Sequence, residues 1–163
     1  MNFTFNRQAA VEYAHRHAYA PNPLYPYKWV KEGEDCTSFV SQCWNWAGIP
    51  KTLEWYCDIE NPDNTPSCWS AAPDFEYYMV TRGYCYLLPI NRFFIDADLG
   101  DVIQFYNGVY WHHSGIITKI TSGSTGKDLY YSAHSNPRLD RPLSEVYKNE
   151  FIRILHVYDE ACW

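Results

Sequence analysis

Apolar residues recur at helical spacing in two segments of the first third of the chain. Within residues 7–18 they lie three and four positions apart, and Asn6 before them is a residue type that caps helix N-termini, so we expect an amphipathic helix. Within residues 36–47 the apolar stripe is wider and predicts a deeply packed helix. Asp35 can cap the first N–H groups of this helix, and Gly48 ends it.

Proline and aromatic residues dominate the segments on either side of the second helix. Residues 19–34 and 51–69 therefore predict irregular loops. A third helix is expected over about 73–82, because Pro73 suits a first helical position and Gly83 follows the last one.

The second half of the chain changes to short runs of β-branched and aromatic residues between turn signals. These runs predict strands over residues 84–88, 102–106, 110–121, 129–134 and 151–158. Asn107-Gly108 indicates a two-residue hairpin, and a short helix is expected from Ser144. Helices first and an antiparallel sheet second predict an α+β fold, with residues 1–163 forming one domain.

The composition is that of a folded domain. Of the 163 residues, 47% are hydrophobic and 18% aromatic, and the surplus aromatic residues could line a groove or simply thicken the core. The net charge of −6 and the lack of a Lys/Arg run argue against nucleic acid and anionic membranes as partners. No apolar run approaches the roughly 18 residues of a spanning helix.

The first residues lack the basic and apolar segments of a signal peptide. We therefore expect a cytoplasmic protein with reduced cysteines, unless the sequence is trimmed or the protein is exported by another route. Cys36 and Cys43 would lie about 10 Å apart on one helix, which is too far for a disulfide. Cys57 and Cys68 could bridge their loop in an oxidising compartment. The pairing state stays open for Cys57, Cys68, Cys85 and Cys162.

Cys36 opens the second helix, and this position suits a nucleophilic thiol. The unpaired N–H groups of a helix N-terminus stabilise a thiolate. Such a thiol also needs a base and a third group to orient that base, and His113 lies on the strand expected at the centre of the sheet. Two adjacent ways of folding the next hairpin place either Asn136 or His134 opposite His113. A zinc site is a weaker interpretation, because no C-x-x-C pair exists and no fourth ligand can be named.

Several segments resemble the putative amidase domain family, which belongs to the papain-like superfamily with the NlpC-type and CHAP cell-wall peptidases. The block Asp35-Cys36-Thr37-Ser38-Phe39-Val40-Ser41-Gln42-Cys43 is the most specific of them. The other segments that resemble the family are residues 6–14, 22–25, 100–103, 113–118 and 132–135. The resemblance covers nearly the whole chain and implies a papain-like, NlpC-like fold, with N-terminal helices packed on a C-terminal antiparallel sheet.

The resemblance also implies roles for individual residues. Cys36 would be the nucleophile, His113 the general base and acid, and His134 the orienting third residue. Asn136 is the alternative third residue, because that position varies between His, Asn and Gln in the superfamily. Tyr25 stands where NlpC-type enzymes place a tyrosine that helps to hold the oxyanion, and the backbone N–H of Cys36 is the other expected donor.

Further aromatic residues are candidates for the substrate cleft. Tyr27 is the alternative to the oxyanion tyrosine, and Trp69 and Trp111 are weaker candidates for the cleft walls. By the two-residue period of a strand, His112 should point to the sheet face opposite His113 and act as a rim residue.

These features together predict a cysteine-dependent amidase or peptidase that forms a thioester acyl-enzyme and needs no metal or other cofactor. A peptide or peptidoglycan-like molecule is the expected substrate, and the oligomeric state stays open. Two alternatives remain. The same triad could carry out acyl transfer or deamidation on a protein target, as in a toxin, or the fold could be a non-catalytic binding module.

Overall fold

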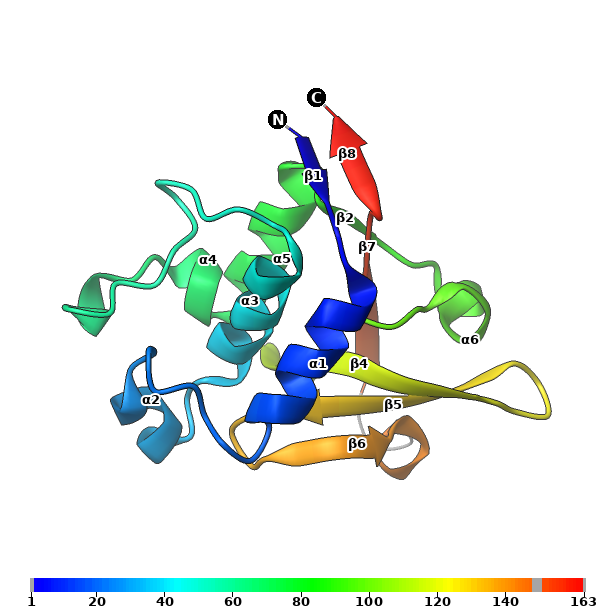
Figure 1. Ribbon diagram of the computed structural model, residues 1–163. Helices are drawn as coiled ribbons and strands as arrows, with labels where there is room; N and C mark the ends of the chain where they lie inside the picture. Colours follow the sequence, from blue (N-terminus) through cyan, green and yellow to red (C-terminus); the bar gives the residue numbers. More distant parts are fainter. Residues whose placement is uncertain (1, 148–150, 163) are drawn as a thin grey trace.

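The computed structural model describes residues 2–147 and 151–162, with the backbone alone described at Tyr27, Lys28 and Cys162 (Figure 1). Its helices are α1 (Arg7–His17), α2 (Tyr27–Glu32), α3 (Cys36–Ala47), α4 (Ser67–Ser70), α5 (Ala72–Thr81) and α6 (Phe93–Asp96), with 3-10 turns η1 (Pro62–Asn64), η2 (Ile90–Arg92) and η3 (Leu143–Glu145). Its strands are β1 (Asn2–Thr4), β2 (Cys85–Leu87), β3 (Val102–Tyr106), β4 (Trp111–Ser122), β5 (Lys127–Ala133), β6 (Arg138–Pro142), β7 (Phe151–Val157) and β8 (Glu160–Cys162).

Six of these strands form one antiparallel sheet in the order β2-β7-β3-β4-β5-β6. β1 and β8 form a separate two-stranded ribbon that holds the two ends of the chain side by side (Figure 1). The expected α+β class with an antiparallel sheet is confirmed.

The two faces of the sheet carry two separate apolar cores. Helices α1, α3 and α5 supply the first, in which Phe39 and Trp44 of α3 pack with Val102 and Ile116 of the sheet. The Trp44 indole donates a hydrogen bond to the carbonyl of Gly100 at 2.8 Å, so this large side chain is buried with its polar atom satisfied. The second core contains Ile103, Phe105, Ile117, Leu129 and Tyr131. β3 and β4 contribute side chains to both cores, as the alternation of a strand requires.

The longer helices begin and end close to their predicted bounds. The Asn6 side chain accepts a hydrogen bond from the Ala9 N–H at 2.9 Å, and α3 covers residues 36–47 as expected. The regular elements that the pattern missed are short. The helices α2 and α4 lie in segments expected to be irregular, α6 lies between two predicted strands, and β1, β6 and β8 are strands of three to five residues. Elements of this length are too short to show a hydrophobic period.

The predicted two-residue hairpin at Asn107-Gly108 is wrong. Tyr106 pairs with Trp111, so four residues connect β3 and β4. The Asn107 side-chain carbonyl accepts the N–H groups of both Val109 and Tyr110, and this closes the longer loop.

Gly48 ends α3 at a point where the chain has no space for a side chain. Its φ is +132°, and a Cβ atom there would approach the carbonyl oxygen of Thr4 to 2.1 Å. Gly83 also has a positive φ, +82°, but open space around it. We expect Gly83→Ala to lower the free energy of unfolding by roughly 1–2 kcal/mol through backbone strain alone. Gly48→Ala should cost about 1–3 kcal/mol more, because β1 must move. Urea unfolding of both variants checks this, and equal losses would contradict it.

Candidate functional site

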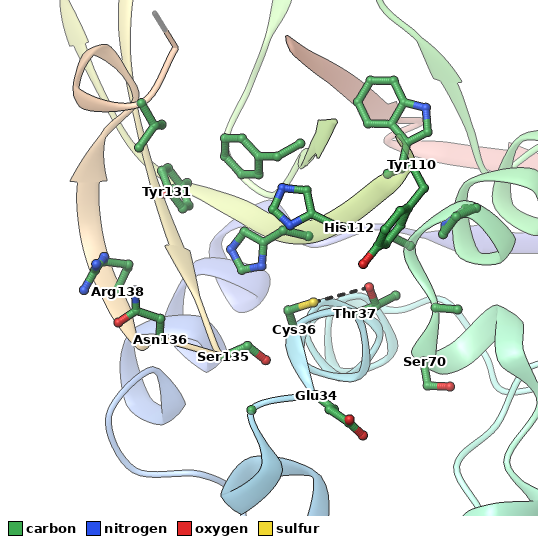
Figure 2. A pocket seen from close by; sticks show the side chains of 18 of the residues that line it. Glu34, Cys36, Thr37, Ser70, Tyr110, His112, Tyr131, Ser135, Asn136 and Arg138 are labelled. Carbon is green, nitrogen blue, oxygen red and sulfur yellow. Dashed lines mark hydrogen bonds between the residues drawn. The ribbon is translucent and has the colours of Figure 1, made fainter. Parts of the chain in front are cut away.

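A cavity of about 780 Å³ opens at the N-terminus of α3, between that helix, β4 and the β5–β6 side of the sheet (Figure 2). The lining residues that concern the chemistry are Cys36, Thr37, Trp111, His112, His113, Asn136, Arg138 and Arg141. The fold thus brings the predicted nucleophile and the predicted base into one space from opposite halves of the chain.

Cys36 is the first residue of α3 and is half-buried. Its sulfur lies 3.8 Å from the Thr37 hydroxyl oxygen (Figure 2). Burial raises the pKa of the Cys36 thiol, and the nearby Asp35 carboxylate adds to this; the Ser114 N–H and the hydroxyl and N–H of Thr37 oppose it. The thiol is therefore protonated at neutral pH in the free protein, whereas its place at a helix N-terminus predicts a thiolate.

His113 lies on β4 opposite Phe105, and the two rings are 5.5 Å apart. Burial lowers the pKa of the imidazole to about 4, and the positive charges of His112, Arg138 and Arg141 contribute smaller effects. In the described part of the structure, no side chain hydrogen-bonds this ring. His113 is therefore neutral at physiological pH and can accept a proton.

A β-bulge brings His112 to the same cavity as His113. Phe105 pairs with His113, but the next residue, Tyr106, pairs with Trp111, so His112 is an extra residue in β4. The expectation that His112 points to the opposite sheet face is wrong, because a bulge interrupts the alternation on which that expectation depends. Both imidazoles and the Trp111 side chain line the cavity.

His134 lies outside the cavity and is almost completely buried. Its Nδ1 is 2.6 Å from the Asp35 carboxylate, and its Nε2 is 2.6 Å from the carbonyl oxygen of His17. A carbonyl only accepts, so Nε2 carries a hydrogen, and the Nδ1–carboxylate contact shares a second proton. The ring also stacks on Phe39 at 3.9 Å. Both nitrogens are thus engaged away from His113, and the expected triad contact of His134 is not formed.

Asp35 does not cap α3 with its side chain, in contrast to the prediction. Its carboxylate faces His134, and its backbone N–H donates to the Ser135 hydroxyl at 3.1 Å. The start of α3 is therefore tied to the segment that follows β5. No local sequence signal could reveal this pairing, because its partners are about a hundred residues apart.

Asn136, the alternative third residue, does line the cavity. Its φ is +79°, a conformation that asparagine tolerates better than most residues. The hairpin pairs Ser122 with Lys127, which agrees with one of the two predicted foldings, but a bulge near Thr118 shifts the register by one residue. Neither folding therefore continues as far as His113.

The predicted oxyanion and cleft residues do not all lie at the cavity. Trp69 has no exposed surface, donates from its indole to the Ser38 hydroxyl at 3.0 Å and belongs to the first core, so its assignment to the cleft is wrong. Tyr25 stacks on Trp69 at 6.0 Å and lines a separate small hollow away from Cys36, and burial raises its pKa to about 12. The side chain of Tyr27 lies outside the described residues. Of Tyr25, Trp69 and Trp111, only Trp111 lines the cavity, together with Cys36 and His112.

The remaining cysteines and the ligand sets give no sign of a metal centre or a disulfide in the described residues. Cys57 and Cys68 are free thiols: Cys57 accepts from the Thr65 hydroxyl at 3.9 Å, and Cys68 donates to the Glu54 carbonyl at 2.8 Å. Among the side chains that the structure describes, no group of three His, Cys, Asp or Glu could hold a metal ion. No helix in the described chain has the length and apolar content to cross a membrane.

Among the comparisons with known proteins, one family model matches most of the chain. The model of the family described as "Putative amidase domain" matches residues 4–158. "Uncharacterized protein YjcM" of Bacillus subtilis (strain 168) is 28% identical over 157 residues, which cover 90% of this chain and 34% of that protein. The chain thus spans about a third of the length of this relative. No solved structure matches the chain.

The environment of His113 predicts an unusual titration. We expect the His113 ring protons in NMR spectra to titrate with a midpoint near pH 4, against about 6.5 in the unfolded chain. Because the unfolded chain then binds this proton first, the His113 contribution should make unfolding easier as the pH falls from about 6.5 to about 4. His113→Gln assigns the signal by its loss, and a midpoint near 6.5 in the folded protein would contradict the expected burial.

Proposed function

The chain belongs to the putative amidase domain family, and on that premise we propose that it hydrolyses amides with Cys36 as nucleophile and His113 as general base. The family description indicates amide hydrolysis, and the cysteine mechanism is our addition. One observation carries it: α3 presents the Cys36 thiol, and β4 presents a neutral imidazole, to the same cavity. A neutral imidazole and a protonated thiol in one cavity suit proton transfer during attack rather than a preformed ion pair.

The proposed reaction proceeds through a thioester. The Cys36 sulfur attacks the amide carbon while its proton passes to His113, and the carbonyl electron pair moves to oxygen. When the C–N bond breaks, the imidazolium of His113 gives that proton to the leaving amine. Water then attacks the thioester and loses a proton to His113, the S–C bond breaks, and the imidazolium reprotonates the thiolate. The products are a carboxylic acid and an amine.

Stabilisation of the oxyanion is assigned to the first turn of α3. The N–H groups of a first helical turn have no acceptor one turn earlier, so that of Cys36 can donate to a ligand. Tyr25 is not assigned to this role, because its ring packs against Trp69 and Lys51 and lines a hollow separate from the cavity.

For the third residue, the placement of the side chains favours Asn136 over His134. Asn136 lines the cavity with His113, whereas both nitrogens of His134 are occupied by Asp35 and His17. An amide carbonyl can accept from the imidazole and orient it once substrate has closed the site.

The cavity wall suggests the class of substrate. Arg138 and Arg141 of β6 give this wall positive charge in a protein with a net charge of −6. Glu145 pairs with Arg141, while the guanidinium of Arg138 donates to the backbone carbonyl of Pro137 and has no carboxylate partner within the described residues. We propose a peptide substrate with a carboxylate close to the scissile amide, a property that peptidoglycan-type peptides share.

Turnover of matched peptides tests the nucleophile and the substrate class together. We expect hydrolysis of peptides with a carboxylate beside the scissile amide, and slower hydrolysis of the same peptides with a carboxamide there. Cys36→Ala should lose all turnover and the acyl-enzyme mass adduct, and Arg138→Met should remove the preference for the carboxylate. Product masses also separate hydrolysis from acyl transfer to an added amine.

The matched control for the nucleophile is Cys68→Ala, which removes another incompletely buried thiol outside the cavity and should leave turnover unchanged. Full activity of Cys36→Ala would contradict the proposal that Cys36 is the nucleophile.

A second pair of variants tests the third residue. Asn136→Gly removes the amide and keeps the left-handed backbone free of strain, so we expect a clear loss of kcat with unchanged thermal stability. Asn136→Asp retains an acceptor and should recover part of the rate. If Asn136→Gly is fully active, the orienting role returns to His134, and substrate binding must then release that ring from Asp35.

A further inference from the structure

Buried side chains form an unbroken row of polar contacts from β7 to the sulfur of Cys36. Arg153 Nε donates to Gln104 Oε1 at 2.8 Å, and Gln104 Nε2 donates to the Ser114 hydroxyl at 3.1 Å. Ser114 and Thr37 hydroxyl oxygens are 2.9 Å apart, and the Thr37 oxygen is 3.8 Å from the Cys36 sulfur. Gln104, Ser114 and Thr37 have no exposed surface.

The chemistry of its neighbours fixes the orientation of the Gln104 amide. Arg153 can only donate, so the amide oxygen must face it. On the other side, the amide nitrogen faces the carbonyl of Ala72 at 2.8 Å, which can only accept. The two hydrogens of the amide nitrogen are then directed at Ala72 and at Ser114, so the Ser114 oxygen is an acceptor in this contact.

This orientation determines the hydroxyl hydrogens further along the row. The described contacts of the Ser114 hydroxyl are Gln104 and Thr37. Because Gln104 donates to it, the Ser114 hydrogen has Thr37 as its acceptor, and a fully buried hydroxyl rarely leaves its hydrogen unused. Thr37 therefore accepts from Ser114, and its own hydrogen is free to point at the Cys36 sulfur (Figure 2).

We propose that Arg153, Gln104, Ser114 and Thr37 form a directional relay of hydrogen bonds that holds the Thr37 hydroxyl as a donor to the Cys36 sulfur. This inference rests on the proposed function, because a donor matters when Cys36 becomes a thiolate. Arg153, Gln104 and Ser114 are positioning residues in this relay, and Thr37 contacts the reacting sulfur itself. The contact of 3.8 Å is weak for the neutral thiol and strengthens as negative charge develops on sulfur.

The relay gives a role to the charged side chain of Arg153 on β7, the strand next to β3. The Arg153 guanidinium lies 4.1 Å from the centre of the Trp111 ring and 3.6 Å from the Glu76 carboxylate. A donor with permanent positive charge at one end polarises each following hydrogen bond in the same sense. The Ser114 N–H also lowers the pKa of the Cys36 thiol. Ser114, the residue after His113, therefore favours the thiolate through its backbone N–H and, by way of Thr37, through its hydroxyl.

The pH dependence of Cys36 alkylation by iodoacetamide tests the relay, with labelling measured at this one cysteine by peptide mass spectrometry. Thr37→Val should raise the apparent thiol pKa by about one unit, a roughly tenfold loss of rate at pH 7. Thr37→Ser should retain the wild-type profile. In Gln104→Glu the ionised carboxylate can only accept, so Ser114 and Thr37 must reverse their hydrogens, and we expect a similar rise in the thiol pKa.

A double-variant cycle separates the relay from a direct effect of the new charge. If Gln104→Glu acts through Thr37, adding it to Thr37→Val produces no further shift, whereas additive shifts would overturn the relay. Thr118→Val is the matched control, because it removes the hydroxyl of another buried threonine, on β4, and should leave the profile unchanged. The Thr118 hydroxyl is bonded to Ser132 at 2.7 Å and to Asp140 at 2.6 Å, outside the relay. Should Thr37→Val not fold, Ser114→Ala and Gln104→Glu carry the test.

Alkylation needs no substrate, so the relay and the proposed function fail separately. An unchanged profile in folded Thr37→Val and Gln104→Glu, together with amide hydrolysis by the wild type, would overturn the relay alone. Shifted profiles without hydrolysis of any peptide would keep the relay and refute the proposed hydrolase.

Discussion

The buried contact between Asp35 and His134 determines where the cavity lies. Asp35 immediately precedes α3, His134 immediately follows β5, and the second ring nitrogen of His134 donates to the end of α1. Three elements from distant parts of the chain therefore meet at one imidazole. A charged or proton-sharing pair of this kind is costly to bury unless every polar atom has a partner, and here the ring nitrogens and the facing carboxylate oxygen do.

Because the residue that precedes α3 is held in this way, the start of the helix is fixed and Cys36 lines the cavity with His113 of β4. The other end of the helix is fixed by Gly48 against β1 and by the indole of Trp44 on Gly100. Across the gap, the bulge in β4 turns two consecutive histidines into the cavity, and the next residue, Ser114, turns back toward α3. The base and the relay to the nucleophile thus come from adjacent residues on opposite faces of one strand.

The long elements could be predicted because their own side chains carry the period of the structure. The apolar stripe of α3 and the cap at Asn6 are local features, and the placement of Cys36 and His113 on a helix end and an interior strand follows from them. The short strands β1, β6 and β8 could not be predicted, since partners elsewhere in the chain complete their hydrogen bonds. The six-residue helix α2 is too short to show a helical period. The absence of β6 from the prediction also hid the cavity wall that carries Arg138 and Arg141.

By itself, the sequence determined the α+β class, the bounds of the principal helices, the helix-end position of one thiol and the strand that carries its candidate base, because these depend on periods and caps a few residues long. The tertiary structure alone decided the rest of the site. It pairs His134 with Asp35 rather than with His113, buries Trp69 in the core, and packs Tyr25 against Trp69 instead of in the cavity. It also keeps the Cys36 thiol protonated and connects that thiol to a row of four polar side chains. Each of these depends on desolvation and on partners far apart in the chain, which local patterns do not contain.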